Sequence, residues 1–193
     1  MANSNKVKFG VDKLHYAIVT ETVGTNGETT TTYGTPKRWN GAVKVSASPE
    51  FMETVFYADN GSYYAKNKLK QYTGSLEVAL VPDDVLEDVF CQSTDSNNIL
   101  YETAEQDTKY VALLFEIDGD QKARRNVFYK CLLKKPSIEG ETTGENSDPK
   151  TDTLDFTMFP RADEDKLVKA CTTADSDATA YAEWYGSVYV PTI

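Results

Sequence analysis

A period-two alternation of apolar and polar residues constrains the fold more than any other feature of this sequence. In residues 73–80, Leu76 and Val78 fall on one side of an extended chain and Glu77 falls on the other. Side chains of a β-strand alternate between its two faces, so this pattern is typical of a half-buried strand. The same alternation occurs in residues 41–48 and 151–161.

Turn signals join several of these segments into hairpins. Asn60-Gly61 lies between the aromatic-rich runs FMETVFYAD and SYYAKN, and Asn-Gly supplies the positive φ angles that tight hairpins require. Asp118-Gly119 similarly lies between the apolar segments 109–118 and 125–135. Consecutive strands are therefore expected to pair in antiparallel fashion.

One segment is typical of a helix instead. Pro82 suits a helix start, two aspartates follow it, and Val85, Leu86, Val89 and Phe90 form one apolar stripe. Many strands and one good helix predict a mainly β protein, specifically a β-sandwich with one flanking α-helix and long extended loops. No repeat or linker divides the chain, so residues 1–193 are expected to form a single domain.

Two long polar stretches interrupt the strands. Residues 24–41 contain four glycines, six threonines and a proline, which favours an extended loop or a loose hairpin. Residues 139–150 are a second loop. Loops of this length within a compact domain usually have a function or are mobile, so 24–41 is a candidate arm.

The sequence offers no enzymatic, metal or cofactor site. The single histidine, His15, has no Gly-x-Ser-x-Gly nucleophile elbow to accompany it, and phosphate-binding glycine loops are missing. Cys91, Cys131 and Cys171 are forty residues apart, which is unsuited to a zinc knuckle and predicts small hydrophobic side chains in the core. The longest apolar run, 111–115, is too short to cross a membrane.

Charge narrows the choice of partners further. Twenty basic and thirty acidic residues give a formal net charge of −10. Tight nucleic-acid binding depends on Lys and Arg that neutralise phosphates, and docking on anionic lipid has the same requirement. The charge therefore argues against both.

Several segments, taken in order, resemble the major tail protein family of long-tailed phages of Gram-positive hosts. The resemblance covers nearly the whole chain, and the segments that carry it are NKVKFGVDKLHYAIVT, YGTPKRWNGAVKVSASPE, FYADNGSYYA, GSLEVALVPDDVLEDV, KYVALLFEIDGD, TLDFTMFPR and AEWYGSVYV. Their joint order carries the resemblance, since no single motif is diagnostic.

The resemblance implies a structural virion protein and not an enzyme. Such proteins form hexameric rings that stack into a hollow tail tube, and an arm of one ring reaches its neighbour. The implied partners are further copies of the chain, the tape-measure, terminator and baseplate proteins, and double-stranded DNA that passes without specific binding. The implied location is the virion tail, after synthesis in the host cytoplasm.

Particular residues can be assigned to these roles as hypotheses. A negative wall would repel phosphates, and we expect Glu77, Asp152 and Asp155 to face the lumen. Tyr33 and Trp39 are candidate anchors of the 24–41 arm, although Trp39 folded back on its own domain is the alternative. Arg124 and Arg125 are candidates for pairing with an acidic surface of the next subunit, or else they form a solvated hairpin tip.

A second function class remains open. Twelve tyrosines and two tryptophans also suit a β-sandwich module that binds carbohydrates or a receptor. That alternative predicts an exposed aromatic platform and dispersed particles, whereas a tube protein predicts rings.

Overall fold

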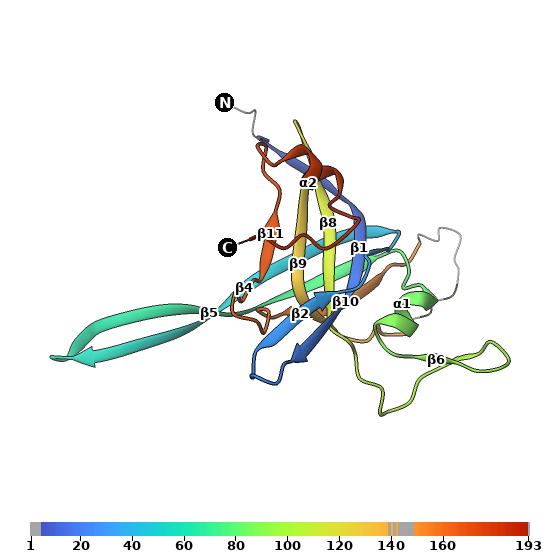
Figure 1. Cartoon of the computed structure of the whole chain (residues 1–193), viewed down its shortest axis with the longest axis horizontal. Coiled ribbons are helices and arrows are strands. Elements are labelled where there is room, and N and C mark those ends of the chain that lie inside the picture. The colour runs from blue at the N-terminus through green and yellow to red at the C-terminus, as the bar shows by residue number, and fades with distance from the viewer. Residues whose placement is uncertain (1–4, 139, 141, 143–148, 193) are drawn as a thin grey trace.

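The computed structural model describes residues 5–138, 140, 142 and 149–192. About half of these residues form a nine-stranded antiparallel sheet (Figure 1). Its strands are β1 (Lys8–Val23), β2 (Thr29–Tyr33), β3 (Lys37–Arg38), β4 (Ala42–Ala58), β5 (Gly61–Val78), β8 (Val111–Gly119), β9 (Arg124–Leu133), β10 (Asp152–Met158) and β11 (Lys169–Cys171). A separate small hairpin pairs β6 (Ser93–Thr94) with β7 (Leu100–Tyr101). The prediction of a mainly β fold is confirmed.

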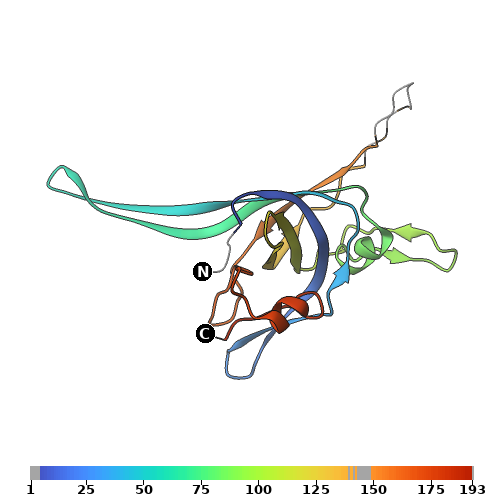
Figure 2. The same ribbon diagram turned by 90° about the horizontal axis from the view of Figure 1, so that it is seen from above.

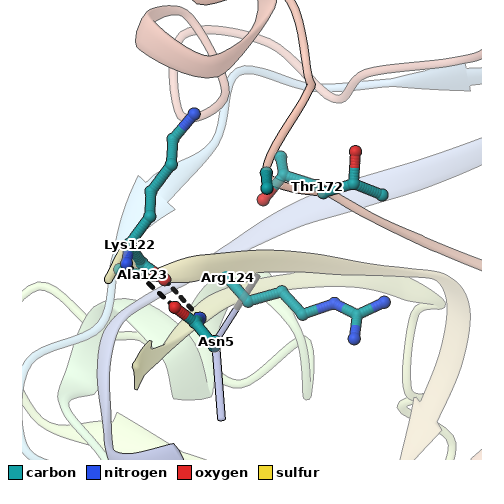
Figure 3. Close-up of a pocket in the computed structure, with 7 residues that line it drawn as sticks. Asn5, Lys122, Ala123, Arg124 and Thr172 are labelled. Carbon is teal, nitrogen blue, oxygen red and sulfur yellow. Dashed lines mark hydrogen bonds between the residues drawn. The ribbon is translucent and has the colours of Figure 1, made fainter. Parts of the chain in front are cut away.

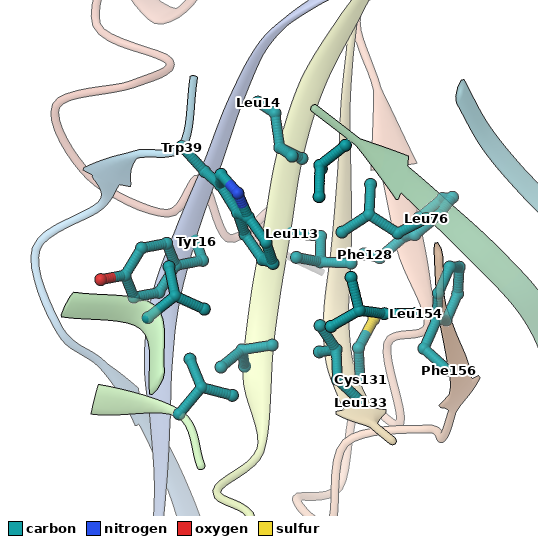
Figure 4. Close-up of a cluster of buried hydrophobic side chains, with 14 of the residues drawn as sticks. Leu14, Tyr16, Trp39, Leu76, Leu113, Phe128, Cys131, Leu133, Leu154 and Phe156 are labelled. Carbon is teal, nitrogen blue, oxygen red and sulfur yellow. The ribbon is translucent and has the colours of Figure 1, made fainter. Parts of the chain in front are cut away.

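The large sheet curls so that its two halves enclose a core. Its main strand order is β2-β1-β8-β9-β10-β5-β4, and the view from above shows β1 arching over the strands inside it (Figure 2). Inward-facing residues from both halves meet there, among them Leu14 of β1, Leu113 of β8 and Leu76 of β5, all with an exposed fraction of 0% (Figure 4). One continuous sheet thus provides both layers of the fold.

The expected helix covers one end of this core. Helix α1 (Asp83–Asp88) follows Pro82, and Asp83 and Asp84 lie in its first turn. Val85, Val89 and Phe90 are buried in the main cluster, as the apolar stripe predicts.

A second apolar cluster lies on the opposite face of β1, β8 and β9. Ala17, Leu114 and Val127 are covered there by the C-terminal segment, whose Trp184 is 4% exposed. This segment includes helix α2 (Ala178–Ala182). Residues 162–172 before it contain β11, which pairs with β9. Both segments lack a clear period, so their contacts with the sheet decide their conformation.

Residues 24–41 lie along β1 instead of extending freely. Strand β2 pairs with the end of β1, and β3 pairs with His15 and Tyr16. The second expected loop, 139–150, falls largely outside the described residues.

The longest projection from the body is the β4–β5 hairpin, which leaves it as a long ribbon (Figures 1 and 2). Its turn is one residue earlier than the Asn-Gly signal suggests. Asp59 and Asn60 have φ angles of 50° and 59°, and Ala58 pairs with Gly61. Two successive positive φ values are typical of a type I′ turn.

Candidate assembly surfaces

The outward face of β4, β5 and β10 carries rows of small hydroxyl side chains. One row crosses the three strands as Ser48, Thr73 and Thr157. The next row is Ser46, Ser75 and Asp155, in which the two serine hydroxyls lie 2.9 Å apart. We call the face formed by Ser46, Ser48, Thr73, Ser75, Thr153 and Thr157 the hydroxyl face.

The alternation that predicts the strands also produces this face. Leu76, Phe156 and Met158 point into the core, so the residues between them must point away from it. A shallow hollow of about 370 Å³ lies over the face, lined by several of its hydroxyls together with Lys134 and Asp155. These hydroxyls were not among the predicted site residues, although Ser and Thr occupy polar positions of all three strands.

Two of the three acids proposed for a lumen belong to this face. Glu77 stands opposite Thr153 in the register, and Asp155 stands opposite Ser75. Asp152 differs, because its carboxylate accepts a hydrogen bond of 2.9 Å from the backbone N–H of Val81. Its bond fixes the chain that leads into α1, so Asp152 has a structural role in the subunit.

The cations beside the hydroxyl face are matched by carboxylates. Lys134 Nζ lies 3.2 Å from Asp155 Oδ2, and Lys44 stands opposite Glu77 in the register. Glu77 also accepts a 2.8 Å hydrogen bond from the Thr151 hydroxyl. A face with this balance offers a phosphate chain no net positive charge.

The projecting ribbon exposes large apolar side chains. We define residues 51–69 as the arm; within it Phe51, Phe56, Tyr57 and Tyr63 are 58%, 59%, 70% and 73% exposed. Strand β10 pairs with β5 only from Tyr72 to Val78, so no third described strand supports the arm. Apolar patches of this kind on a soluble chain usually mark an interaction surface.

Both ends of the sheet are open edges among the described residues. Strand β2 pairs only with β1, and β4 pairs only with β5. Unpaired edge strands present free backbone N–H and C=O groups to a further chain.

Trp39 does not extend from the body. Its indole is 1% exposed, packs edge-on against the Tyr16 ring, and donates a 3.2 Å hydrogen bond to the carbonyl of Leu80. This placement corrects the expectation that Trp39 anchors an arm, because no part of the indole remains for a neighbouring subunit. Its alternative, folding back on its own domain, describes what is observed.

Tyr33 also packs within its own chain. Its ring lies 6.3 Å from that of Tyr129, and the Arg161 guanidinium lies 5.8 Å from its centroid. Burial raises the pKa of the Tyr33 hydroxyl well above its ordinary value. An anchoring role for Tyr33 in a neighbouring subunit therefore gains no support from its position.

The two arginines at the start of β9 separate into different environments. Arg125 has 12% of its side chain exposed, lies 3.3 Å from Glu116 and stacks 3.9 Å from the Tyr181 ring. Arg125 thus fastens the C-terminal segment to the sheet and is not part of a solvated hairpin tip. Arg124 is exposed, and its Nη2 lies 2.7 Å from the sulfur of Cys171.

The remaining candidate groups have structural surroundings. His15 stacks on Tyr185 at 4.4 Å, and its Nδ1 lies 2.7 Å from the carbonyl oxygen of Lys13. Cys131 is fully buried as expected, whereas Cys91 is half-buried and Cys171 is exposed. In the part of the chain that the structure describes, no cluster of His, Cys, Asp and Glu has the arrangement of a metal site. No helix there has the length and apolarity that a membrane span requires.

Neither a protein-family model nor a curated protein matches this chain. Solved structures with a similar chain path include the sheath–tube complex of the extracellular contractile injection system PVC in its extended state. That chain shares 8% identity with a TM-score of 0.41, over 83% of this chain and 88% of that one. A chain of the anti-feeding prophage cap (AFP tube terminating cap) shares 9% identity with a TM-score of 0.39, over 90% and 97% of the two chains. Both scores and both identities are low, so these structures assign no role to this chain.

Proposed function

We propose that this protein is a non-enzymatic structural subunit of a phage-type tail tube. In this proposal six copies form a ring, rings stack into a hollow tube, and double-stranded DNA leaves the virion through the bore. The observation that carries the proposal is the arm, whose apolar side chains are exposed in the isolated subunit and need a partner. The sequence resemblance to the tail proteins of long-tailed phages of Gram-positive hosts points the same way.

The hydroxyl face suits the wall of the bore. Its small polar side chains hydrogen-bond with water, and Glu77 and Asp155 balance the neighbouring lysines. A surface without excess positive charge releases few counterions from DNA and so holds it weakly. The net charge of −10 adds a general repulsion of phosphates.

The open edges suit the contacts around a ring. Pairing the β4 edge of one copy with a strand of the next would satisfy the free backbone groups and would continue the sheet around the bore. The arm would then reach beyond its own ring. A tape-measure protein, a terminator and a baseplate would bind such a tube along its interior and at its two ends.

Deleting the arm tests this function. Joining residue 50 to residue 70 through Asn-Gly should preserve the folded body, because the arm pairs only with itself. We expect the full chain to form rings or tubes of uniform bore in negative-stain electron microscopy and the deletion variant to remain monomeric. The control is the far-ultraviolet circular dichroism spectrum. Scaled per residue, the spectrum of the deletion variant should show the same β-sheet signal as that of the full chain. Tubes that form without the arm would contradict the proposal.

A carbohydrate- or receptor-binding module is the second candidate. Tyr57, Tyr63 and Tyr64 at the end of the arm are 70%, 73% and 54% exposed, and aromatic faces can stack on sugars. This candidate predicts dispersed particles that bind immobilised glycans through those three tyrosines. Micrographs and a glycan-binding assay on the same sample distinguish the two functions.

A further inference from the structure

A large groove opens at the end of the curled sheet opposite α1. Its volume is about 1010 Å³, and the start of β1, β4, the β8–β9 end and β11 line it. Apolar residues form its floor, including Val45, Phe115 and Met158. The groove is open to solvent, and its apolar floor is suited to receive side chains from another chain.

Basic residues surround this apolar floor. Lys6, Lys8, Arg124 and Lys169 line the groove against one acid, Asp118. Among the described residues none of these four cations has an ion-pair partner. The rim is therefore a local positive surface on a chain whose net charge is −10.

The N-terminal strand is held at the mouth of the groove. The Asn5 amide donates a 2.6 Å hydrogen bond to the Lys122 carbonyl, and its oxygen accepts bonds of 3.0 Å from the backbone of residues 121 and 122 (Figure 3). The Lys6 N–H also donates to Asp120 at 2.8 Å. Lys6 and Lys8 consequently belong to a fixed rim.

The β6–β7 hairpin has the complementary character. Residues 91–108, the hairpin and the segment after it, contain Asp95, Glu102, Glu105 and Asp107 and no lysine or arginine. Glu102 is paired with Lys135 at 2.6 Å, which leaves three carboxylates for a partner. Ile99 directly precedes β7 and Tyr101 lies in it, and the two side chains are 60% and 47% exposed. Asp95 accepts backbone bonds of 2.8 and 2.9 Å from residues 97 and 99, which fixes the shape of the tip.

The groove and the hairpin lie on different sides of one subunit. In both views the β6–β7 hairpin points away from the strands that line the groove (Figures 1 and 2). A chain cannot place its own hairpin in its own groove without unfolding. Any contact between the two surfaces must therefore join two copies.

We propose that the β6–β7 hairpin of one copy inserts Ile99 and Tyr101 into the basic-rimmed groove of the next copy. This inference rests on the self-assembly proposed above and names a second contact in it, distinct from the arm. The interface is heterologous, since each copy contributes a hairpin on one side and a groove on the other. Such interfaces form closed rings or open stacks, depending on the rotation between copies.

Cysteine crosslinking tests the contact directly, because exposed Cys171 already lines the groove. In an Ile99→Cys variant, mild oxidation with copper-phenanthroline should link copies head to tail, since disulfides require Cα atoms within about 7 Å. We expect dimers, trimers and larger species on a non-reducing gel. The ladder should disappear when Cys171→Ser is added.

A matched variant controls for random collision. Ile138 is fully exposed and lies outside both surfaces, so Ile138→Cys should give no ladder under the same oxidation.

Charge reversal gives an independent measure of the contact. Lys8→Glu with Lys169→Glu should raise the concentration needed for assembly about tenfold, and Glu105→Lys with Asp107→Lys should do the same. Combining all four substitutions should restore assembly at the original concentration. Glu28→Lys at the exposed β1–β2 turn should leave the concentration needed for assembly unchanged.

The outcomes separate this inference from the proposed function. Rings or tubes that form without a Cys171-dependent ladder would overturn the groove contact and leave the tube function standing. A chain that neither assembles nor crosslinks would overturn both. A ladder without tubes would support the contact and count against the tube.

Discussion

Gly74 is the position where the close packing of this sheet allows no side chain. A Cβ there would meet the backbone carbonyl oxygen of Ser46 and lie 2.5 Å from the ring of Phe156. Phe156 belongs to the core directly beneath the hydroxyl face. The absence of a side chain at Gly74 therefore lets β4, β5 and β10 pack closely.

We expect Gly74→Ala to lower the free energy of unfolding by about 2–4 kcal/mol, because the core must shift to accommodate the methyl group. Gly10→Ala is the matched control, since a Cβ at Gly10 has nothing within 4 Å. Its effect should stay within about 0.5 kcal/mol. Urea denaturation measures both, and equal losses would contradict the packing argument.

His15 gives the fold a pH dependence of known sign. Burial holds the pKa of the ring below its ordinary value of 6.5; the Arg38 charge acts in the same direction, and the Lys13 carbonyl opposes it. The unfolded chain therefore binds the proton more readily than the folded chain. Stability from this group is complete above the unfolded pKa and decreases as pH falls below it.

Replacing His15 should remove that dependence. Between pH 7 and pH 5.5 the free energy of unfolding of the natural chain should fall more steeply than that of His15→Gln. Because His15 is the only histidine, the difference between the two curves reports on one group. A steeper fall in the variant would show that the sign is wrong.

At the scale of elements, the C-terminal segment covers apolar surface that the sheet would otherwise expose. Trp184 stacks 5.5 Å from Tyr189, and the Tyr129 hydroxyl donates a 2.9 Å hydrogen bond to the Tyr189 carbonyl. The Arg125 guanidinium stacks 3.9 Å from the Tyr181 ring, and the Tyr185 hydroxyl donates a 3.3 Å hydrogen bond to Glu116. Packing and hydrogen bonds thus fasten this segment to the sheet.

Trp184→Ala should destabilise the chain by about 3–5 kcal/mol and increase the binding of a hydrophobic dye. Phe9→Ala provides the comparison, because the Phe9 side chain is 66% exposed. Calorimetry should show a clear drop in Tm for the first variant and little change for the second. A small effect at Trp184 would mean that the segment is not part of the cooperative unit.

The sequence predicts elements best where a local pattern and the packing agree. Strands with strict alternation, the 82–90 helix and the central hairpin were expected close to where they occur. The position of Trp39 was not predicted in this way. A polar loop sequence contains no sign of the buried pocket against Tyr16 that accepts the indole. Glu77 and Asp155 reach one face by alternation. Asp152 has the parity of the core residues Leu154 and Phe156, so the same alternation turns it to the other face, where it accepts a hydrogen bond from the Val81 N–H.

For the whole molecule, the distribution of charge matters more than its total. The rim of the groove is basic, the β6–β7 hairpin is acidic, and the hydroxyl face pairs its lysines with carboxylates. A uniform charge of −10 would keep copies apart, but this distribution allows particular surfaces to attract one another. In the proposed tube, DNA would meet the hydroxyl face, whose lysines are balanced by Glu77 and Asp155.

We expect the natural chain to leave the fluorescence anisotropy of a labelled DNA duplex unchanged at about 0.15 M salt. Glu77→Lys with Asp155→Lys adds positive charge beside Lys44 and Lys134 and should produce salt-sensitive DNA binding. Glu28→Lys with Glu183→Lys makes the same change of net charge elsewhere and should bind DNA less well. Strong binding by the natural chain would be incompatible with a conduit.

The arm pairs only with itself, so the residues that stabilise the body differ from the residues that are exposed for contact with a partner. Most proteins must meet these two requirements with the same residues. Substitutions between positions 51 and 69 can alter the surface that the arm exposes without destabilising the curled sheet that carries it. Proteins with this architecture can therefore change the partner that the arm contacts while the folded body stays the same. A new arm tip could be grafted onto the body by design in the same way.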